Sequence, residues 1–150
     1  MQLAGWWSRV GAWFLDGLFR FLLAGAVFGL LIAVDSVGGA VDTVGTIVIA
    51  PTILVVYFGY PAATMRRAGA RNGQTWGKQL LGIRVVRDDG AAYGIGSALV
   101  RELVVKELLI GFVGAIAFSI PFVVDSLWPL WDDSNRALHD MIVSSHVVRA

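Results

Sequence analysis

The sequence has no cysteine, few charged residues and almost no net charge. The lack of cysteine excludes disulfides, thiolate metal sites and a cysteine nucleophile. Charged residues make up 15% of the 150 residues, whereas an ordinary soluble domain carries about 25%. A net charge of +1 provides no general attraction for nucleic acid. These shortages argue against a soluble enzyme and against a nucleic-acid-binding protein.

Apolar residues are abundant, at 57% of the chain, and they gather in three long regions. Residues 13–34 and 44–65 each reach the length of about 20 residues needed to cross a hydrocarbon core about 30 Å thick. The third region, residues 108–131, is interrupted by two prolines and by Asp125. The sequence therefore predicts one domain over residues 1–150: an all-α membrane bundle with two full spans and a third apolar region.

The basic residues are concentrated in the loop between the second and third regions. Residues 35–43 contain two aspartates and no Lys or Arg, whereas residues 66–107 contain eight basic residues. Because loops rich in Lys and Arg stay on the cytoplasmic side, we expect residues 66–107 and the N-terminus to be cytoplasmic in a multi-pass protein of the cell membrane. Six of these residues are candidates for binding anionic lipid headgroups or a partner: Arg66, Arg67, Arg71, Lys78, Arg84 and Arg87.

The same loop contains a β-prone segment and a helical one. Residues 80–86 are followed by a turn sequence at residues 88–90 and then by residues 91–93, which predicts a short cytoplasmic β-hairpin. A helix is expected from Ile95, with Ser97 as a possible cap. Glu102 and Lys106 are spaced to pair on that helix.

The third apolar region has two interpretations. In a straight span, Asp125 would lie about 25 Å into the membrane and near its outer surface. In a hairpin bent near residues 119–121, Asp125 returns to the inner half near Arg20, and the C-terminus is cytoplasmic. A continuous helix over residues 95–131 would be about 55 Å long, far more than the membrane requires. Residues 147–148 could also pair with residues 83–86 only if both lie on one side. We expect the hairpin, although its returning segment is short for a full crossing.

The first span carries charges on one stripe. Arg9, Asp16 and Arg20 are spaced by seven and four residues, so they project from one helix face. Charged groups within a span cost about 2.5–3.5 kcal/mol each and are a default sign of function. Arg20 could also extend to the membrane surface. A transport site and a structural ion network both remain open.

Other motifs are weak. Residues 73–78 lack the spacing of a phosphate-binding loop. The pair formed by His139 and His146 is poor evidence for a metal, and a single buried hydrogen bond is the simpler interpretation. We predict no catalytic residues, no metal and no cofactor.

Several segments resemble the RDD family of membrane proteins. They are Trp7-Ser8-Arg9 followed by Asp16, the segment over residues 73–86, Arg101, Asp125, the triplet over residues 138–140 and the final valines at 147–148. The chain departs from the family at Trp76, where proline is more usual, and at residues 144–146. The arginine and two aspartates of the family name map onto Arg9, Asp16 and Asp125, with Asp140 as a competitor for the last position. The resemblance implies a role in transport, since cation/proton exchange has been proposed for some members.

Two functional hypotheses follow. In the first, the chain is a small transporter exchanging a monovalent cation for protons, with Asp16 and Asp125 as ion-binding carboxylates whose charge Arg9 and Arg20 adjust. So small a chain would need to form a homo-oligomer, for which Gly25 and Gly29 offer a packing face. In the second, the chain is a non-transporting adaptor or assembly factor that binds another membrane protein or lipid through its basic loop.

Overall fold

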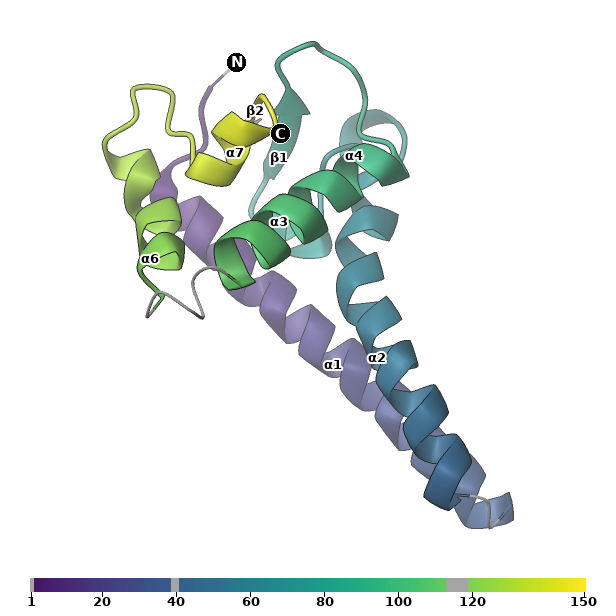
Figure 1. The fold of residues 1–150 in the computed structure, drawn as a ribbon. Coiled ribbons are helices and arrows are strands. Elements are labelled where there is room, and N and C mark those ends of the chain that lie inside the picture. Colours follow the sequence, from purple (N-terminus) through teal and green to yellow (C-terminus); the bar gives the residue numbers. More distant parts are fainter. Residues whose placement is uncertain (1, 39–40, 113–118) are drawn as a thin grey trace.

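Two long helices project from a group of shorter elements in the computed structural model, which describes residues 2–38, 41–112 and 119–150 (Figure 1). Helices α1 (Trp6–Gly38) and α2 (Val41–Met65) run side by side in opposite directions. We call residues 21–38 and 41–56 the arm, and the remaining described residues the head. The described part is mostly helical and carries one small sheet, as the sequence predicts.

Helix α1 is suited to lipid rather than to a protein interior. Its 33 residues extend over about 50 Å at 1.5 Å per residue. Among the described residues, Trp6–Leu30 is the one helical stretch that meets the length and hydropathy expected of a membrane span, and only 11% of its most apolar part is buried. The core helix of a soluble protein would be mostly buried, so the apolar surface of α1 requires another solvent.

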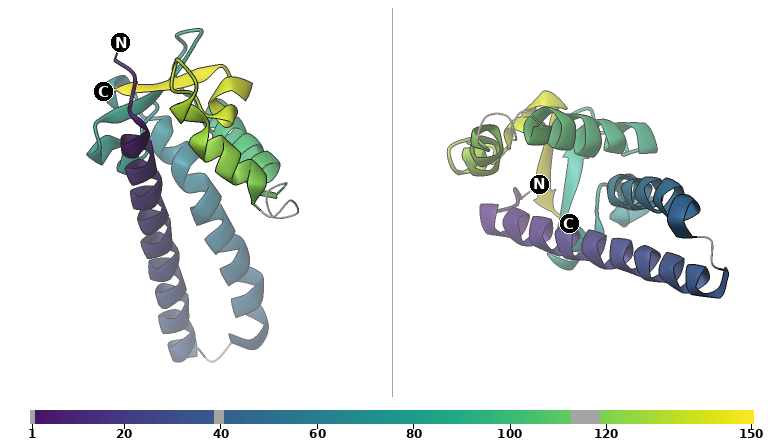
Figure 2. Two further views of the ribbon diagram at one scale, coloured as in Figure 1. Left: turned by 90° about the vertical axis from the view of Figure 1, so that its left-hand side faces the viewer. Right: turned by 60° about the horizontal axis from the view of Figure 1, so that its bottom comes forward.

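The sheet joins distant parts of the chain. Strand β1 (Ile83–Arg87) pairs antiparallel with β2 (Ser145–Arg149). The N-terminal segment adds to β2, because Ala4 N donates to Val147 O at 3.0 Å and Arg149 N donates to Gln2 O at 2.9 Å. Both chain ends therefore lie at the head, beside the loop that follows α2, as Figure 2 shows.

The predicted β-hairpin is wrong. The turn at residues 88–90 forms, with Gly90 N donating to Arg87 O, but residues 91–93 do not pair with β1. The Asn72 side chain instead forms hydrogen bonds with both polar backbone groups of Tyr93. Its Nδ2 donates to Tyr93 O at 2.9 Å, and its Oδ1 accepts from Tyr93 N at 2.8 Å. With those groups occupied, β1 takes its partner from β2, the pairing that the bent third region allows.

A helix begins at Ile95, as predicted. Helix α4 (Ile95–Leu99) leads into the π-helical segment η2 (Val100–Phe112). Ser97 stands three residues after the N-cap Gly94 rather than at the cap itself, and its hydroxyl accepts from Gly94 N at 2.9 Å. The predicted pair of Glu102 and Lys106 is present at 3.6 Å.

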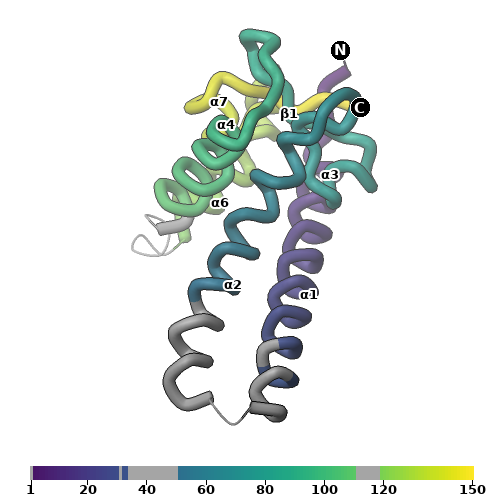
Figure 3. Tube along the Cα trace, turned by 90° about the vertical axis from the view of Figure 1, so that its right-hand side faces the viewer, coloured from purple at the N-terminus to yellow at the C-terminus, as the bar shows by residue number. Residues whose placement is uncertain are grey.

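The third apolar region is not one straight helix. Helix α6 (Ile120–Leu127) and the short helix η3 (Trp128–Leu130) return along η2 to the head (Figures 1 and 3). Trp6 Nε1, at the start of α1, donates to Ser126 O in α6 at 2.8 Å. The third region is therefore bent, but the predicted approach of Asp125 to Arg20 is wrong: Asp125 lies near the N-terminal end of α1 and pairs with His139, whereas Arg20 pairs with Glu107. Most of the predicted bend lies in residues 113–118, outside the described residues.

Two further short helices complete the head. Helix α3 (Trp76–Leu80) packs on α1, and α7 (Leu138–Ile142) packs on η2 and α6. A turn of 3₁₀ helix, η1 (Gly69–Arg71), follows α2. The small hydrophobic core between them is formed by Ala4, Ala12, Ala62, Met65, Ile83, Val85, Tyr93, Ala98 and Val147.

Candidate functional site

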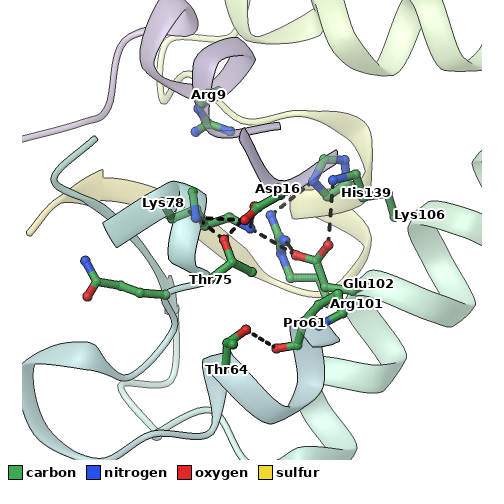
Figure 4. Close-up of polar contacts among 12 residues, drawn as sticks. Arg9, Asp16, Pro61, Thr64, Thr75, Lys78, Arg101, Glu102, Lys106 and His139 are labelled. Carbon is green, nitrogen blue, oxygen red and sulfur yellow. Dashed lines mark hydrogen bonds and ion pairs between the residues drawn. The ribbon is translucent and has the colours of Figure 1, made fainter. Parts of the chain in front are cut away.

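Asp16 is buried in the head and accepts hydrogen bonds at both carboxylate oxygens (Figure 4). Its Oδ1 accepts from the Tyr60 hydroxyl and from Gly77 N, each at 2.8 Å. Its Oδ2 accepts from Thr75 Oγ1 at 2.6 Å. Lys78 Nζ lies 3.8 Å from the same oxygen. The carboxylate is thus satisfied by protein donors.

The glycine-rich segment over residues 73–78 forms the pocket that holds Asp16. Gly73 has a φ of +75°, and a Cβ there would lie 2.0 Å from a carbonyl oxygen of β1. A Cβ on Gly77 would lie 2.5 Å from Ala12 O and 2.7 Å from Asp16 Oδ1. Thr75 is the N-cap of α3, so its hydroxyl both caps the helix and donates to Asp16. The segment that looks like a phosphate-binding loop is therefore a binding loop for the chain's own carboxylate.

Ion pairs continue from Asp16 through Glu102. Lys78 Nζ lies 3.3 Å from Glu102 Oε1, and Lys106 lies 3.6 Å from the other oxygen. Burial alone would raise the pKa of Glu102, but the neighbouring charges of Lys78, Lys106 and Arg101 hold that pKa well below its usual range. Glu102 therefore stays ionised inside the head.

Arg101 connects the ion pairs around Glu102 with those around Asp140. Its side chain is 2% exposed, and its guanidinium bridges Glu102 and Asp140. Arg9 Nη1 lies 2.6 Å from the other oxygen of Asp140. Burial would raise the pKa of Asp140, but the neighbouring charges of Arg101 and Arg9 lower that pKa far below its usual value. Helices α1, η2 and α7 are thereby connected through one carboxylate.

Asp125 has a different kind of partner. His139 N donates to Asp125 Oδ1 at 2.8 Å, and His139 Nδ1 lies 2.8 Å from Oδ2. On the other side of the ring, Nε2 lies 3.0 Å from Arg101 Nη2. Because arginine can only donate, Nε2 must accept, and the hydrogen of a neutral ring is then on Nδ1, where it donates to Asp125. This geometry fits a neutral His139.

We call the nine connected side chains the charge network: Arg9, Asp16, Lys78, Arg101, Glu102, Lys106, Asp125, His139 and Asp140. They comprise four Lys or Arg residues, four carboxylates and one histidine. With His139 neutral, the formal charges cancel. One added proton or one added cation leaves a single positive charge in excess.

A cavity of about 260 Å³ adjoins the network between α1, α6 and α7. Arg9, Asp16, Asp125 and His139 are among its polar lining residues. Much of the remaining wall is apolar and includes Trp6, Val10, Trp13 and Phe122. A small charged group, or one with an apolar body, fits this chemistry.

Of the residues predicted from the first span, Arg9 and Asp16 join the network and Arg20 does not. Arg20 Nη1 lies 3.1 Å from Glu107, and its guanidinium lies 4.9 Å from the centre of the Tyr57 ring. The structure does not bring Arg20 and Asp125 together. Both competing aspartates, Asp125 and Asp140, are buried in the network.

The six basic loop residues have unequal surroundings. Arg66 and Arg71 are exposed. Arg67 donates to backbone and side-chain oxygens of its own loop, and Arg87 pairs with Asp89. Arg84 is half-buried. Lys78 is buried in the network and is not presented on the surface with the others.

Sequence reasoning missed the contributions of Tyr60, Thr75 and Glu102. Tyr60 is buried, and its hydroxyl donates to Asp16 Oδ1. Two signals were available in the sequence. Thr75 lies between Gly73 and Gly77, where a helix N-cap is common, and Glu102 follows Arg101 in a largely apolar helix. His139 has the expected buried hydrogen bond.

The chain matches the sequence profile of the RDD family over residues 3–144. The chain belongs to the RDD family. It is 26% identical over 165 residues to the uncharacterized protein YxaI of Bacillus subtilis strain 168, covering 97% of this chain and 96% of the relative. It is 24% identical over 147 residues to the uncharacterized protein YckC of the same strain, covering 98% and 85%. No solved structure matches significantly.

The RDD family is membrane-associated, in agreement with the apolar α1. The segment over residues 73–86 joins two parts of this RDD protein. It binds Asp16 at one end and forms β1 at the other. The segment thereby fixes α1 onto the head.

Proposed function

We propose that this RDD protein is a multi-pass protein of the cell membrane that exchanges a monovalent cation for a proton at Asp125 and His139. One observation carries the proposal. Asp125 is the one carboxylate of the charge network without an Arg or Lys partner among the described residues. Its oxygens accept instead from the backbone N and the ring Nδ1 of His139, a side chain that can carry a proton on either ring nitrogen.

The exchange rests on competition beside one carboxylate. A proton added at His139 Nε2 makes the ring a cation that pairs with Asp125. A Na⁺ or K⁺ ion entering the cavity would bind the same oxygens, and two positive charges there repel each other. Loading the cation thus expels the proton from Nε2, and each exchange moves one positive charge in each direction.

Protonation also changes the contacts of Arg101. An imidazolium Nε2 cannot accept from Arg101 Nη2, so the 3.0 Å contact becomes a repulsion between two donors. Asp140 Oδ1, at 3.4 Å from Nε2, is the acceptor within reach. Arg101 also holds Glu102, so the state of His139 is transmitted to η2.

The proposed topology has two membrane spans in the arm and a cytoplasmic head. It is supported by the joining of both chain ends to the sheet beside the basic loop. A 150-residue chain would enclose a path only as a homo-oligomer. Gly25 and Gly29 have nothing within 4 Å of a built Cβ, which leaves that face of α1 open for a second copy.

The test is transport by purified protein in proteoliposomes with a pH gradient. We expect Na⁺ or K⁺ to dissipate the gradient, and Asp125→Asn to lower the initial rate by about tenfold or more. Asp133→Asn is the matched control, since it removes the same charge from an exposed position and should leave the rate unchanged. A wild-type protein that moves no Na⁺, K⁺ or H⁺, or an unimpaired Asp125→Asn variant, ends the proposal.

A second candidate is a non-transporting adaptor or assembly factor. It is favoured by the complete pairing of Asp16 and Asp140, which makes most of the network structural. Arg66 and Arg71 are exposed for a partner protein or lipid. A stoichiometric membrane-protein partner that is lost in an Arg66→Gln, Arg71→Gln variant, together with absent transport, would favour this candidate.

A further inference from the structure

Arg9 has donor capacity that the protein does not use. Its Nη1 pairs with Asp140, but its Nε and Nη2 are buried without a hydrogen-bond partner, and so is Nε of Arg101. Buried guanidinium groups are nearly always satisfied, and an exception calls for an unseen partner. Arg9 and Arg101 both line the 260 Å³ cavity. The missing partner is therefore an acceptor, and it would enter from the cavity.

Part of the cavity wall is aromatic. Trp13 of α1 and Phe122 of α6 both line it, and their ring centroids are 6.0 Å apart. Both side chains are also partly exposed on the surface. Aromatic side chains of this kind favour the boundary between lipid and water. A ligand that fits this wall has an apolar portion next to its acceptor.

We propose that the cavity binds the phosphate headgroup of one anionic phospholipid. The phosphate oxygens accept from Arg9 Nε and Nη2, because a guanidinium fork fits an oxyanion through two parallel hydrogen bonds. Both nitrogens are buried in this structure, so binding requires the guanidinium to turn toward the cavity while Nη1 keeps its bond to Asp140. The acyl chains lie along the apolar wall formed by Trp13, Phe122 and Val10. The cation of the proposed exchange would enter the same cavity, so a bound lipid would compete with it. The binding test does not require transport.

The site differs from general attraction to a charged surface. Arg66 and Arg71 are exposed and would concentrate anionic lipid with no fixed stoichiometry. A free phosphate ion would use Arg9 but not the apolar wall formed by Trp13, Phe122 and Val10. The distinguishing property is one bound lipid per chain, whose binding depends both on Arg9 and on the apolar wall.

Native mass spectrometry of the full chain in neutral detergent tests the proposal, with short-chain phosphatidylglycerol, short-chain phosphatidylcholine and inorganic phosphate as probes. We expect one phosphatidylglycerol per chain, bound at least about tenfold more tightly than inorganic phosphate. Phosphatidylcholine has the same phosphate but should bind more weakly, because its choline cation would lie near Arg9, Lys78, Arg101 and Lys106 of the cavity lining. Arg9→Gln should weaken it about tenfold or more, as the loss of charge-assisted hydrogen bonds predicts. Arg66→Gln removes the same charge from the surface. It should change the affinity less than about twofold, because an exposed charge contributes little to binding energy.

A second variant protects the test if Arg9→Gln does not fold. Val10→Phe fills the cavity and removes no charge, so it should weaken phosphatidylglycerol binding and leave the helical circular dichroism unchanged. Equal losses in Arg9→Gln and Arg66→Gln would overturn the proposal in favour of surface attraction. Inorganic phosphate binding as well as the lipid, or full lipid affinity in Val10→Phe, would overturn it as well.

Discussion

The two ends of α1 belong to the same helix but face different solvents. Toward the N-terminus, Arg9 and Asp16 contact partners from α2, α3 and α7. Beyond Arg20, Phe21 is 74% exposed and Leu30 is 65% exposed. One end is packed like the interior of a soluble protein, and the other has an apolar surface with little protein contact.

The difference shows how a chain with few charges uses them. Most of the buried charged side chains that the structure describes lie in the head, where they meet partners of opposite charge. Lipid would leave such groups unpaired, at a cost of several kcal/mol each. The arm therefore presents the apolar surface of the protein, and the paired charges of the head determine which elements pack together.

The largest effect is expected from Arg101→Met, which leaves Asp140 and Glu102 without their shared cation. Removing one partner of a buried ion pair costs about 3–5 kcal/mol. Thermal unfolding in detergent, followed by helical circular dichroism, measures the loss. A variant as stable as the wild type would show that the head does not depend on its charge network.

Gly77→Ala should have the next largest effect, about 1–3 kcal/mol for an overpacked contact. The new Cβ would lie 2.5 Å from Ala12 O, so α3 must move away from Asp16. Gly17→Ala, one residue from Asp16 with nothing within 4 Å of its Cβ, should instead stabilise α1 slightly. Equal melting temperatures for the two variants would contradict the close docking of α3.

Acidification should weaken the head and leave the arm helical. Glu102 and Asp140 have pKa values held below normal in the folded chain, so the unfolded chain binds protons first as pH falls. Their stabilisation is complete above about pH 5 and declines as pH falls through about 4 and below, by up to about 1.4 kcal/mol per pH unit for each group. Unfolding midpoints measured against pH check this. Glu102→Gln should flatten the acid limb, and an unchanged slope would remove Glu102 from the explanation.

The smallest effect is expected in the arm. Phe21→Leu changes a side chain that faces outward, and exposed substitutions of this kind usually stay within about 0.5 kcal/mol. The same unfolding assay compares it directly with Arg101→Met. A loss as large as that of Arg101→Met would mean that Phe21 packs against protein, for example in a homo-oligomer, and the contrast between the two ends would disappear.

The sequence predicted what depends on composition and periodicity. The long apolar helices, the stripe carrying Arg9 and Asp16 and the return of Asp125 toward the head follow from span length and charge placement. Partner choice does not follow from them. Lys78 has the same local pattern as a surface lysine, yet it is buried beside Asp16 of α1 and Glu102 of η2. The predicted hairpin is wrong because the Asn72 side chain forms hydrogen bonds with the backbone N and O of Tyr93, in the expected second strand.

The pairing of β1 with β2 also fixes an order of events during synthesis. Residues 83–87 leave the ribosome long before residues 145–149, which are their strand partners. Helices α1 and α2 can therefore form while the head is still open, and the N-terminal segment also lacks its partner until β2 is made. Folding of the head is a late step that needs its last strand, and truncation after residue 144 would leave β1 and the N-terminal segment without that strand.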